Sequence, residues 1–332
     1  MAHPSKPAQG RADKILPGIW RLRLPLPWDA TPHGNAYAVA HDGGIVLFDT
    51  GFGGRDGLRH LEFALAQAGF TLDDIRLIAC THEHSDHFGC AASIVERTGC
   101  PVWIHPAFDH VRHYVDDLAG VAERRFAYLI ANGVPAEIAE QARAARAEIE
   151  PGLDGMVEPE RNLVDGVEIE TDLGTWVTHE APGHAPGHVV FHHPKRRFLI
   201  SGDVIVGRVF LYFDCGHTPD PLGEFLGSLD VIDGLDVGLC LSGHGRPFRA
   251  VPGKVAANRE AVARHLDRVR AALAGGHETF YDIGIAASGR DELPPAAIGY
   301  IVELTDAFVT HLCHLGEVSP SETDGARIWK RT

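Results

Sequence analysis

The sequence has little of what marks secreted, membrane-spanning or nucleic-acid-binding proteins. Its 332 residues include six cysteines and no C-x-x-C pair, which favours free thiols in a reducing compartment such as the cytoplasm. The segment 1–12 lacks the apolar core of a signal peptide, and no stretch is expected to be long and apolar enough to span a membrane. The formal net charge of −15 shows no basic excess, which disfavours nucleic acid as a partner.

Histidine, in contrast, is abundant, and it clusters in the stretch Thr81-His-Glu-His-Ser-Asp-His87. The apolar run 75–80 before it is typical of a buried strand, and the run 91–97 after it has a helical pattern. The cluster is therefore expected on a strand-to-helix loop, where side chains can converge. Imidazole and carboxylate are preferred ligands of zinc and similar divalent metals. A polar loop that merely contains many histidines is the weaker alternative.

Three later stretches each place a metal-ligand type of residue beside a glycine-containing turn. His184 lies in a Pro-Gly-His-Ala-Pro-Gly-His run, Asp203 ends a strand-like run in Gly-Asp, and His244 lies in a Gly-His-Gly turn. Asp49 ends another apolar run, and a buried carboxylate there needs a partner. With the His-x-His-x-Asp-His motif at 82–87, this order of motifs resembles the metallo-β-lactamase fold superfamily.

The resemblance implies a four-layer αββα sandwich and a site for two Zn²⁺ ions, with iron or manganese as alternatives. The ligands it implies are His82, His84 and His184 for one metal, Asp86, His87 and His244 for the other, and Asp203 as the bridge. Asp49 would orient a ligand histidine, with Thr81 and His188 as further supporting residues. His188 is not expected to be a ligand, because the family uses the first histidine of this turn.

A dinuclear site of this kind implies a hydrolase in which a metal-bound hydroxide attacks the substrate, with Asp86 as a ligand that also accepts a proton. No Gly-x-Ser-x-Gly motif is present for a serine nucleophile. The resemblance is to the glyoxalase II-like and lactamase-beta-2-like branch, because Asp203 stands where many true β-lactamases have cysteine. The expected substrate is a small thioester such as an acyl-CoA, a lactone or another ester.

Three alternatives stay open at this point. The same two metals suit a phosphodiesterase or nuclease. Iron in the same ligand set would suit a dioxygenase, since side chains alone do not separate zinc from iron. A non-enzymatic, metal-stabilised binding module is the third, but structural zinc sites are usually closed, and this one would keep open positions.

The chain divides into segments of different character. Residues 1–12 are expected to form a disordered tail, and 13–250 a catalytic domain of α/β class with a helical insertion at 106–150 over the site. Residues 251–332 are expected to form a C-terminal helical extension. It resembles the small winged-helix tail of some superfamily members, but we favour a helical cap that packs on the core or on a second subunit in a homodimer. Helical patterns at 295–300 and 302–315 are followed by a hairpin pattern that ends near residue 331.

The cleft can be predicted only loosely. Candidate substrate contacts are Phe210, Tyr212, Arg124 and Arg125. The two aromatic residues lie in the run 207–213, which has the pattern of a core strand. The arginines of the insertion, Arg146 among them, could bind an anionic group such as a coenzyme A phosphate. The alternative, which we favour from sequence, is that they form ion pairs with glutamates on solvated helix faces.

The run 15–26 is expected to form an edge strand and a turn.

Overall fold

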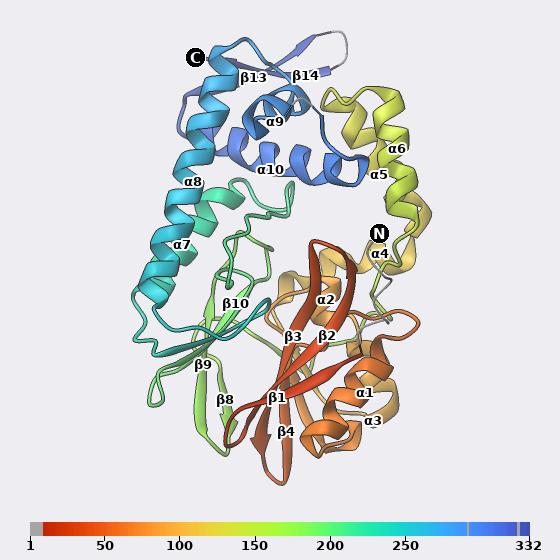
Figure 1. Cartoon of the computed structure of the whole chain (residues 1–332), viewed down its shortest axis with the longest axis vertical. Coiled ribbons are helices and arrows are strands. Elements are labelled where there is room, and N and C mark those ends of the chain that lie inside the picture. The colour runs from red at the N-terminus through yellow and green to blue at the C-terminus, as the bar shows by residue number, and fades with distance from the viewer. Residues whose placement is uncertain (1–8, 291, 324–325) are drawn as a thin grey trace, which may run out of the picture.

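The computed structural model describes residues 9–290, 292–323 and 326–332, and its two main sheets lie in the lower part of Figure 1. The first sheet has seven strands in the order β1-β2-β3-β4-β5-β6-β7. Its strands are β1 (Arg11–Leu16), β2 (Ile19–Trp28), β3 (Thr31–His41), β4 (Gly44–Phe48), β5 (Ile75–Ala79), β6 (Val102–Ile104) and β7 (Arg161–Asn162). The pairs from β1 to β4 are antiparallel, and those from β4 to β7 are parallel.

The second sheet has five strands in the order β12-β11-β10-β9-β8. Its strands are β8 (Glu168–Thr171), β9 (Gly174–Glu180), β10 (Val189–His193), β11 (Phe198–Gly202) and β12 (Leu239–Ser242). The β11–β12 pair is parallel and the other pairs are antiparallel. The parallel pairs of both sheets end in loops, and those loops carry most of the predicted ligands.

The two sheets pack face to face with helices outside. Between them, Phe48 of β4 contacts Trp176 of β9 and Phe191 of β10, at ring-centroid distances of 5.5 and 5.0 Å. The helices α1 (Gly57–Ala68) and α3 (Ala91–Thr98) share a core with the outer face of the first sheet. The helices α7 (Pro221–Asp233) and α8 (Val251–Ala274) do the same for the second sheet. The predicted four-layer αββα sandwich is confirmed.

Local sequence explains these elements. Every residue of β4 is buried, as expected for a strand that is covered on both faces. Helix α1 buries Leu61, Ala64 and Leu65, which share one face at helical spacing, and it ends at Gly69, which has a left-handed φ of 88°. The 3-10 helix η1 (Leu72–Asp74) then leads into β5. The short helix α2 (Ser85–Phe88) follows β5 and contains part of the histidine cluster.

The helical insertion and the C-terminal extension lie together above the sandwich (Figure 1). The insertion comprises the 3-10 helix η2 (Pro106–Arg112) and the helices α4 (His113–Asp116), α5 (Leu118–Ala131) and α6 (Ala136–Ala147). The extension adds α9 (Phe280–Ser288), α10 (Pro295–His314) and the predicted hairpin, β13 (Val318–Thr323) with β14 (Ala326–Arg331). Helices α6 and α10 pack on each other, and α5, α6, α9 and α10 share the core of the second sheet.

One expectation for the N-terminal region is wrong, and another is confirmed in part. Strand β1 begins at Arg11, so the last two residues of the predicted tail are paired with β2, and residues 1–8 lie outside the described residues. The run 15–26 contains the expected edge strand, as the end of β1, and the expected turn, but its remaining residues belong to a second strand, β2. Gly18 adopts a φ of 85°, which lets the chain reverse at Pro17-Gly18 and form two antiparallel strands.

The run 207–213 is an extended loop, and the strand predicted there is wrong. Its backbone polar groups bind side chains in place of a neighbouring strand. The Tyr212 carbonyl contacts a ring nitrogen of His184 at 3.1 Å, and the Leu211 carbonyl accepts a hydrogen bond from the Tyr300 hydroxyl at 2.8 Å. The loop therefore connects the site to α10.

The two helices predicted at 295–300 and 302–315 are one continuous helix, α10. Its length and apolarity reach those of a membrane span, contrary to the expectation that no stretch would. Half of its most apolar window is buried inside the protein, and Val302, Phe308 and Leu312 belong to the core. A core helix explains the same composition.

Candidate metal centre

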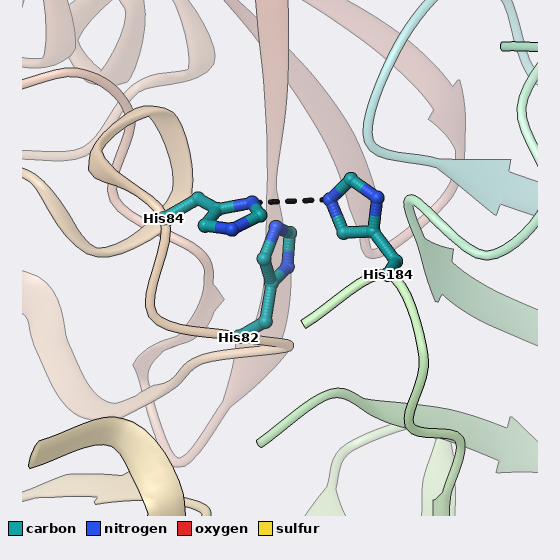
Figure 2. A group of neighbouring side chains, drawn as sticks. All are labelled: His82, His84 and His184. Atoms are coloured by element: carbon teal, nitrogen blue, oxygen red, sulfur yellow. Dashed lines mark hydrogen bonds between the residues drawn. The ribbon is translucent and has the colours of Figure 1, made fainter. Parts of the chain in front are cut away.

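Three histidines from two loops meet in one group, which Figure 2 shows. His82 follows β5, His84 precedes α2, and His184 lies in the loop between β9 and β10. Each can offer one ring nitrogen so that the three nitrogens lie within 4.8 Å of one another. The closest pair, His84 Nδ1 and His184 Nε2, is 3.0 Å apart. Both sheets thus contribute to the group.

A second group, Asp86, His87 and His244, lies beside the first. The Nε2 atom of His244 is 3.2 Å from Asp86 Oδ2 and 3.0 Å from Asp203 Oδ2. Asp203 also lies 3.5 Å from His87 Nε2 and 3.9 Å from His184 Nε2, so its carboxylate is between the two groups. The structure therefore brings together all seven residues that the sequence analysis named.

Each of the five imidazoles is held through one ring nitrogen. The holding contacts are Thr81 Oγ1 with His82 Nδ1 (2.9 Å), Asp214 Oδ2 with His84 Nε2 (2.8 Å), Asp49 Oδ2 with His87 Nδ1 (2.9 Å), the Tyr212 carbonyl with His184 Nδ1 (3.1 Å) and the His33 carbonyl with His244 Nδ1 (3.1 Å). In every case the other ring nitrogen belongs to the cluster. Metal-binding histidines are oriented in this way in proteins.

Asp49 acts on two parts of the site. It directly follows β4 and has a φ of 63°, an uncommon value for a residue other than glycine. Its Oδ1 accepts a hydrogen bond from the Thr81 backbone N–H at 2.7 Å, while Oδ2 contacts His87. The buried carboxylate thus fixes the start of the histidine loop and the ring of His87, which are the contacts expected of an orienting residue.

Several buried atoms of the cluster have no hydrogen-bond partner among the described residues. They are His82 Nε2, His87 Nε2 and Asp203 Oδ1. Unpaired buried polar atoms are costly and rare, unless a ligand completes them. Ligand nitrogens at tetrahedral angles around zinc would lie roughly 3.3 Å apart, close to the 3.0 Å of His84 and His184. The donor set therefore fits divalent metal ions.

The electrostatics of the cluster also favour a cation. Burial, followed by the charge of neighbouring histidines, holds the pKa of His82 well below its usual value, so its imidazole is neutral. Burial opposes the charged form of His244, but Asp203 outweighs it and raises the pKa of His244 to about 10. In the same way Asp214 raises the pKa of His84 to about 9. A metal ion would take the place of these protons.

Small residues leave room for the donors. A Cβ atom on Gly243 would lie 2.1 Å from Asp203 Oδ1, so no larger residue fits there while Asp203 keeps its position.

The Nε2 atom of His188 accepts a hydrogen bond from the Asp203 backbone N–H at 3.1 Å. His188 therefore supports the bridge between the groups without joining them, as expected.

A third cluster was missed from the sequence. Glu83, His110 and Asp214 lie next to the histidines, and their ligand-type atoms are within 4.8 Å of one another. His110 Nε2 is 3.5 Å from the same Asp214 oxygen that contacts His84. Asp214 stands only two residues after the predicted Tyr212, but nothing in its local sequence distinguishes it from a turn residue.

A cleft of about 1730 Å³ opens over the cluster and is lined by residues of the insertion, the 207–213 loop and α10. The Tyr212 ring lies 5.5 Å from the rings of both His84 and His184. Tyr300 is parallel to Tyr212 at 6.5 Å, and Phe210, which is half exposed, stacks on Tyr300 at 5.5 Å. Both predicted aromatic residues therefore line the cleft.

The two predicted arginines differ. Arg125 lines the cleft and forms a 3.0 Å ion pair with Glu303 of α10. Arg124 is exposed and pairs with Asp117 at 2.9 Å on the outside of the insertion, so its assignment to the cleft is wrong. Helical periodicity places consecutive residues about 100° apart, and the sequence did not show which of the two faces inward.

Residues 31–244 match the family model described as the metallo-beta-lactamase superfamily. The chain belongs to this superfamily. The probable metallo-hydrolase YqjP of Bacillus subtilis is 24% identical over 262 residues, which cover 76% of this chain and 79% of that protein. The probable metallo-hydrolase YybB of the same organism is 27% identical, over 68% of this chain and 82% of its own.

Solved structures share the fold of this superfamily member beyond the matched region. A metallo-beta-lactamase family protein from Thermus thermophilus aligns with a TM-score of 0.76 and 25% identity, over 96% of this chain and 100% of the other. A beta-lactamase domain protein from Burkholderia ambifaria aligns with a TM-score of 0.79 and 24% identity, over 99% and 96%. The likeness therefore includes the helices after residue 244.

Proposed function

We propose that this superfamily member is a metal-dependent hydrolase of a small carbonyl substrate, with a thioester, a lactone or another ester as the bond that is cleaved. The observation that carries the proposal is that five histidine rings, each fixed by a polar contact to one ring nitrogen, converge with Asp86 and Asp203 on the lining of a large cleft. Membership of a metallo-hydrolase superfamily supports hydrolysis as the class of reaction.

In this proposal, two divalent ions, with zinc as the first candidate, occupy adjacent positions. His82, His84 and His184 would hold one ion and Asp86, His87 and His244 the other, with the Asp203 carboxylate available to both groups. Ions bound there would supply Lewis acidity and lower the pKa of a water molecule toward about 7. The open cleft above the cluster leaves access for a substrate carbonyl.

The chain's own residues then have separate tasks. Burial opposes ionisation of Asp86, but His87 and His244 outweigh it and lower its pKa to about 2, so the carboxylate is in the ionised form that a metal ligand requires. Its second proposed role, that of proton acceptor, is based on its position at the cleft. Asp49, Asp214 and Thr81 keep the imidazoles oriented. Tyr212 forms the wall next to the first histidine group and keeps solvent from that side.

Ester-type substrates are favoured by two features. Asp203 stands at the bridging position where many true β-lactamases have cysteine, which disfavours a β-lactam as the substrate. The cleft of about 1730 Å³ exceeds the roughly 300–1,000 Å³ of ordinary small-molecule pockets, so it can hold an extended acyl or leaving group.

All six cysteines are free, which supports our proposal of a reducing, cytoplasmic location.

A substrate panel tests the proposal. Purified protein is loaded with zinc, manganese or iron, and its hydrolysis of acyl-CoA, glutathione thioester, lactone and 4-nitrophenyl ester substrates is compared with that of chelator-treated protein. We expect turnover of at least one class that depends on metal and is lost in His84→Ala. Turnover that survives both chelation and His84→Ala, or its absence on every class with every metal, would contradict the proposal.

A further inference from the structure

The arginines of the insertion separate into two kinds in the structure. Arg112, Arg124 and Arg143 are exposed and form ion pairs with carboxylates on neighbouring turns or helices. Arg125 and Arg146 instead line the cleft over the metal cluster. Helical spacing alone could not distinguish these two kinds. The sequence-based interpretation, that the arginines form ion pairs on solvated helix faces, holds only for Arg112, Arg124 and Arg143.

Arg125 is fixed in place by α10. Its guanidinium pairs with Glu303 at 3.0 Å and passes over Gly299, where a Cβ atom would lie 2.7 Å from Arg125 Nη2. Only a residue without a side chain allows this approach. The charge of Arg125 is therefore largely compensated by Glu303, and Arg125 serves as a rigid edge of the cleft.

Arg146 differs, because no carboxylate of the described residues lies within 4.0 Å of it. Its one hydrogen bond goes from Nη1 to the backbone carbonyl of Ile149 at 3.1 Å. The side chain is partly buried, and burial followed by the nearby charge of Arg125 lowers its pKa. A half-buried guanidinium that faces a cleft and has no carboxylate partner is free to bind an anion there.

The surroundings of Arg146 form a path to the metal cluster. Tyr114 and Tyr212 line the same cleft as Arg125 and Arg146. The Tyr212 ring in turn lies 5.5 Å from the rings of His84 and His184. A substrate that reaches Arg146 can therefore extend along Tyr212 to the site of hydrolysis.

Three further arginines line the same cleft. Arg23, Arg208 and Arg246 line it, and in the described part of the chain none of them has a carboxylate within 4.0 Å. Several of the cleft's carboxylates are already engaged, since Asp86 and Asp203 belong to the metal groups and Asp13 pairs with Arg21. In a chain with a net charge of −15, arginines without a carboxylate partner that gather in one cleft would attract anions to it.

From these contacts we infer that the substrate is an anion, and that Arg146, beside Arg125, binds its carboxylate or phosphate group while the scissile carbonyl lies at the metal cluster. This inference deepens the proposed function and rests on it for the position of the reacting bond. The anion subsite itself rests only on the cleft geometry.

A matched pair of esters tests the inference by activity. The metal-loaded protein is assayed with 4-nitrophenyl hemisuccinate, which is anionic, and with 4-nitrophenyl butyrate, which has a neutral acyl chain of the same length. We expect the wild type to have the higher kcat/KM for the anionic ester. Arg146→Gln should reduce that preference roughly tenfold to hundredfold through KM, as expected for a lost charge-assisted hydrogen bond. Arg146→Lys should restore part of it.

Arg143→Gln is the matched control, because Arg143 lies on the same helix, is exposed and pairs with Glu140 and Glu123. It should leave the preference unchanged. An equal preference in wild type and Arg146→Gln, or an equal loss in Arg143→Gln, would overturn the inference.

A binding measurement separates this inference from the proposed reaction. Inorganic phosphate and succinate are titrated into chelator-treated protein, so that metals cannot bind the anion, and the shift in the thermal unfolding midpoint is followed. We expect at least one anion to stabilise the wild type and Arg143→Gln but not Arg146→Gln, and the anion that does so identifies the group. If neither ester is hydrolysed but this difference is present, the subsite stands and the proposed reaction fails. If no anion distinguishes Arg146→Gln from the wild type, the subsite is wrong.

Discussion

Four of the seven clustered ligand-type residues come from six consecutive positions, 82–87, whereas the cleft wall above them comes from segments spread over most of the chain. Tyr114, Arg125 and Arg146 belong to the insertion, Tyr212 to a loop after β11, and Tyr300 to α10. The metal centre is therefore a local motif completed by three strand-end residues, and the cleft is a product of tertiary packing. Chemistry and substrate selection are carried by different kinds of structure.

The largest effect is expected from a substitution in the metal centre. Asp86→Ala removes a donor and the proposed proton acceptor, so activity should fall by at least about a hundredfold, beyond the loss typical of a supporting residue, and metal content should drop. Activity and elemental analysis check this. Asp73→Ala, a carboxylate in the turn before β5 and away from the cluster, is the control and should change neither quantity. Full activity of Asp86→Ala would refute the ligand assignment.

The next effect concerns the residue that joins the two regions. Asp214 holds His84 and follows directly on the cleft segment, so Asp214→Asn should weaken metal affinity or activity by roughly 10–100-fold. A competition titration with a metal chelator measures the affinity. Asp236→Asn, an exposed carboxylate that pairs with Arg197, is the matched control. If both variants bind metal like the wild type, Asp214 does not position the site.

A smaller effect tests whether the insertion and α10 form one wall. Arg125→Ala leaves the Glu303 carboxylate buried without its partner, and this should lower the free energy of unfolding by about 1–2 kcal/mol after allowance for solvent screening. Arg124→Ala removes an exposed pair and should change it by less than about 0.5 kcal/mol. Urea unfolding of the two variants measures the difference. Equal values would mean that the Arg125–Glu303 pair does not hold the wall together.

The last effect concerns the C-terminal extension alone and appears only as the pH is lowered. Burial, followed by the charge of Arg268, lowers the pKa of His265 to about 4, and its Nε2 has no partner among the described residues, while the ring contacts Phe308. Because the folded-state pKa lies below the unfolded value of about 6.5, the unfolded state binds the extra proton between these two values. The His265 contribution to stability is therefore complete above pH 6.5 and is lost as the pH falls toward 4.

His265→Phe isolates this contribution. The free energy of unfolding of the wild type should fall relative to that of the variant by about 1–2 kcal/mol between pH 6.5 and 4.5. Chemical unfolding at several pH values measures the difference, in which the titrations that are common to both proteins cancel. A difference that stays constant with pH would show that His265 is not buried in its neutral form.

Sequence was sufficient for the fold class and for the seven clustered residues, because the motifs that contain the donors follow one another in an order that resembles the metallo-β-lactamase superfamily, and the resemblance implies both. It was not sufficient where a residue's role depends on what packs against it. The strand expected at 207–213 is a loop, because its carbonyls bind His184 and Tyr300. Arg124 and Arg125 are neighbours in a helix with the same chemistry, and only the position of α10 separates them. Asp214 was missed for the same reason.

The most direct test of the account is a crystal structure of metal-loaded protein with anomalous scattering data collected at the absorption edge of the bound metal. We predict two peaks per chain, roughly 3.5–4 Å apart. One should lie among His82, His84 and His184, and the other among Asp86, His87 and His244, with the Asp203 carboxylate between them. The absence of metal peaks at this cluster in protein with metal-dependent activity, or peaks held by other residues, would contradict the account.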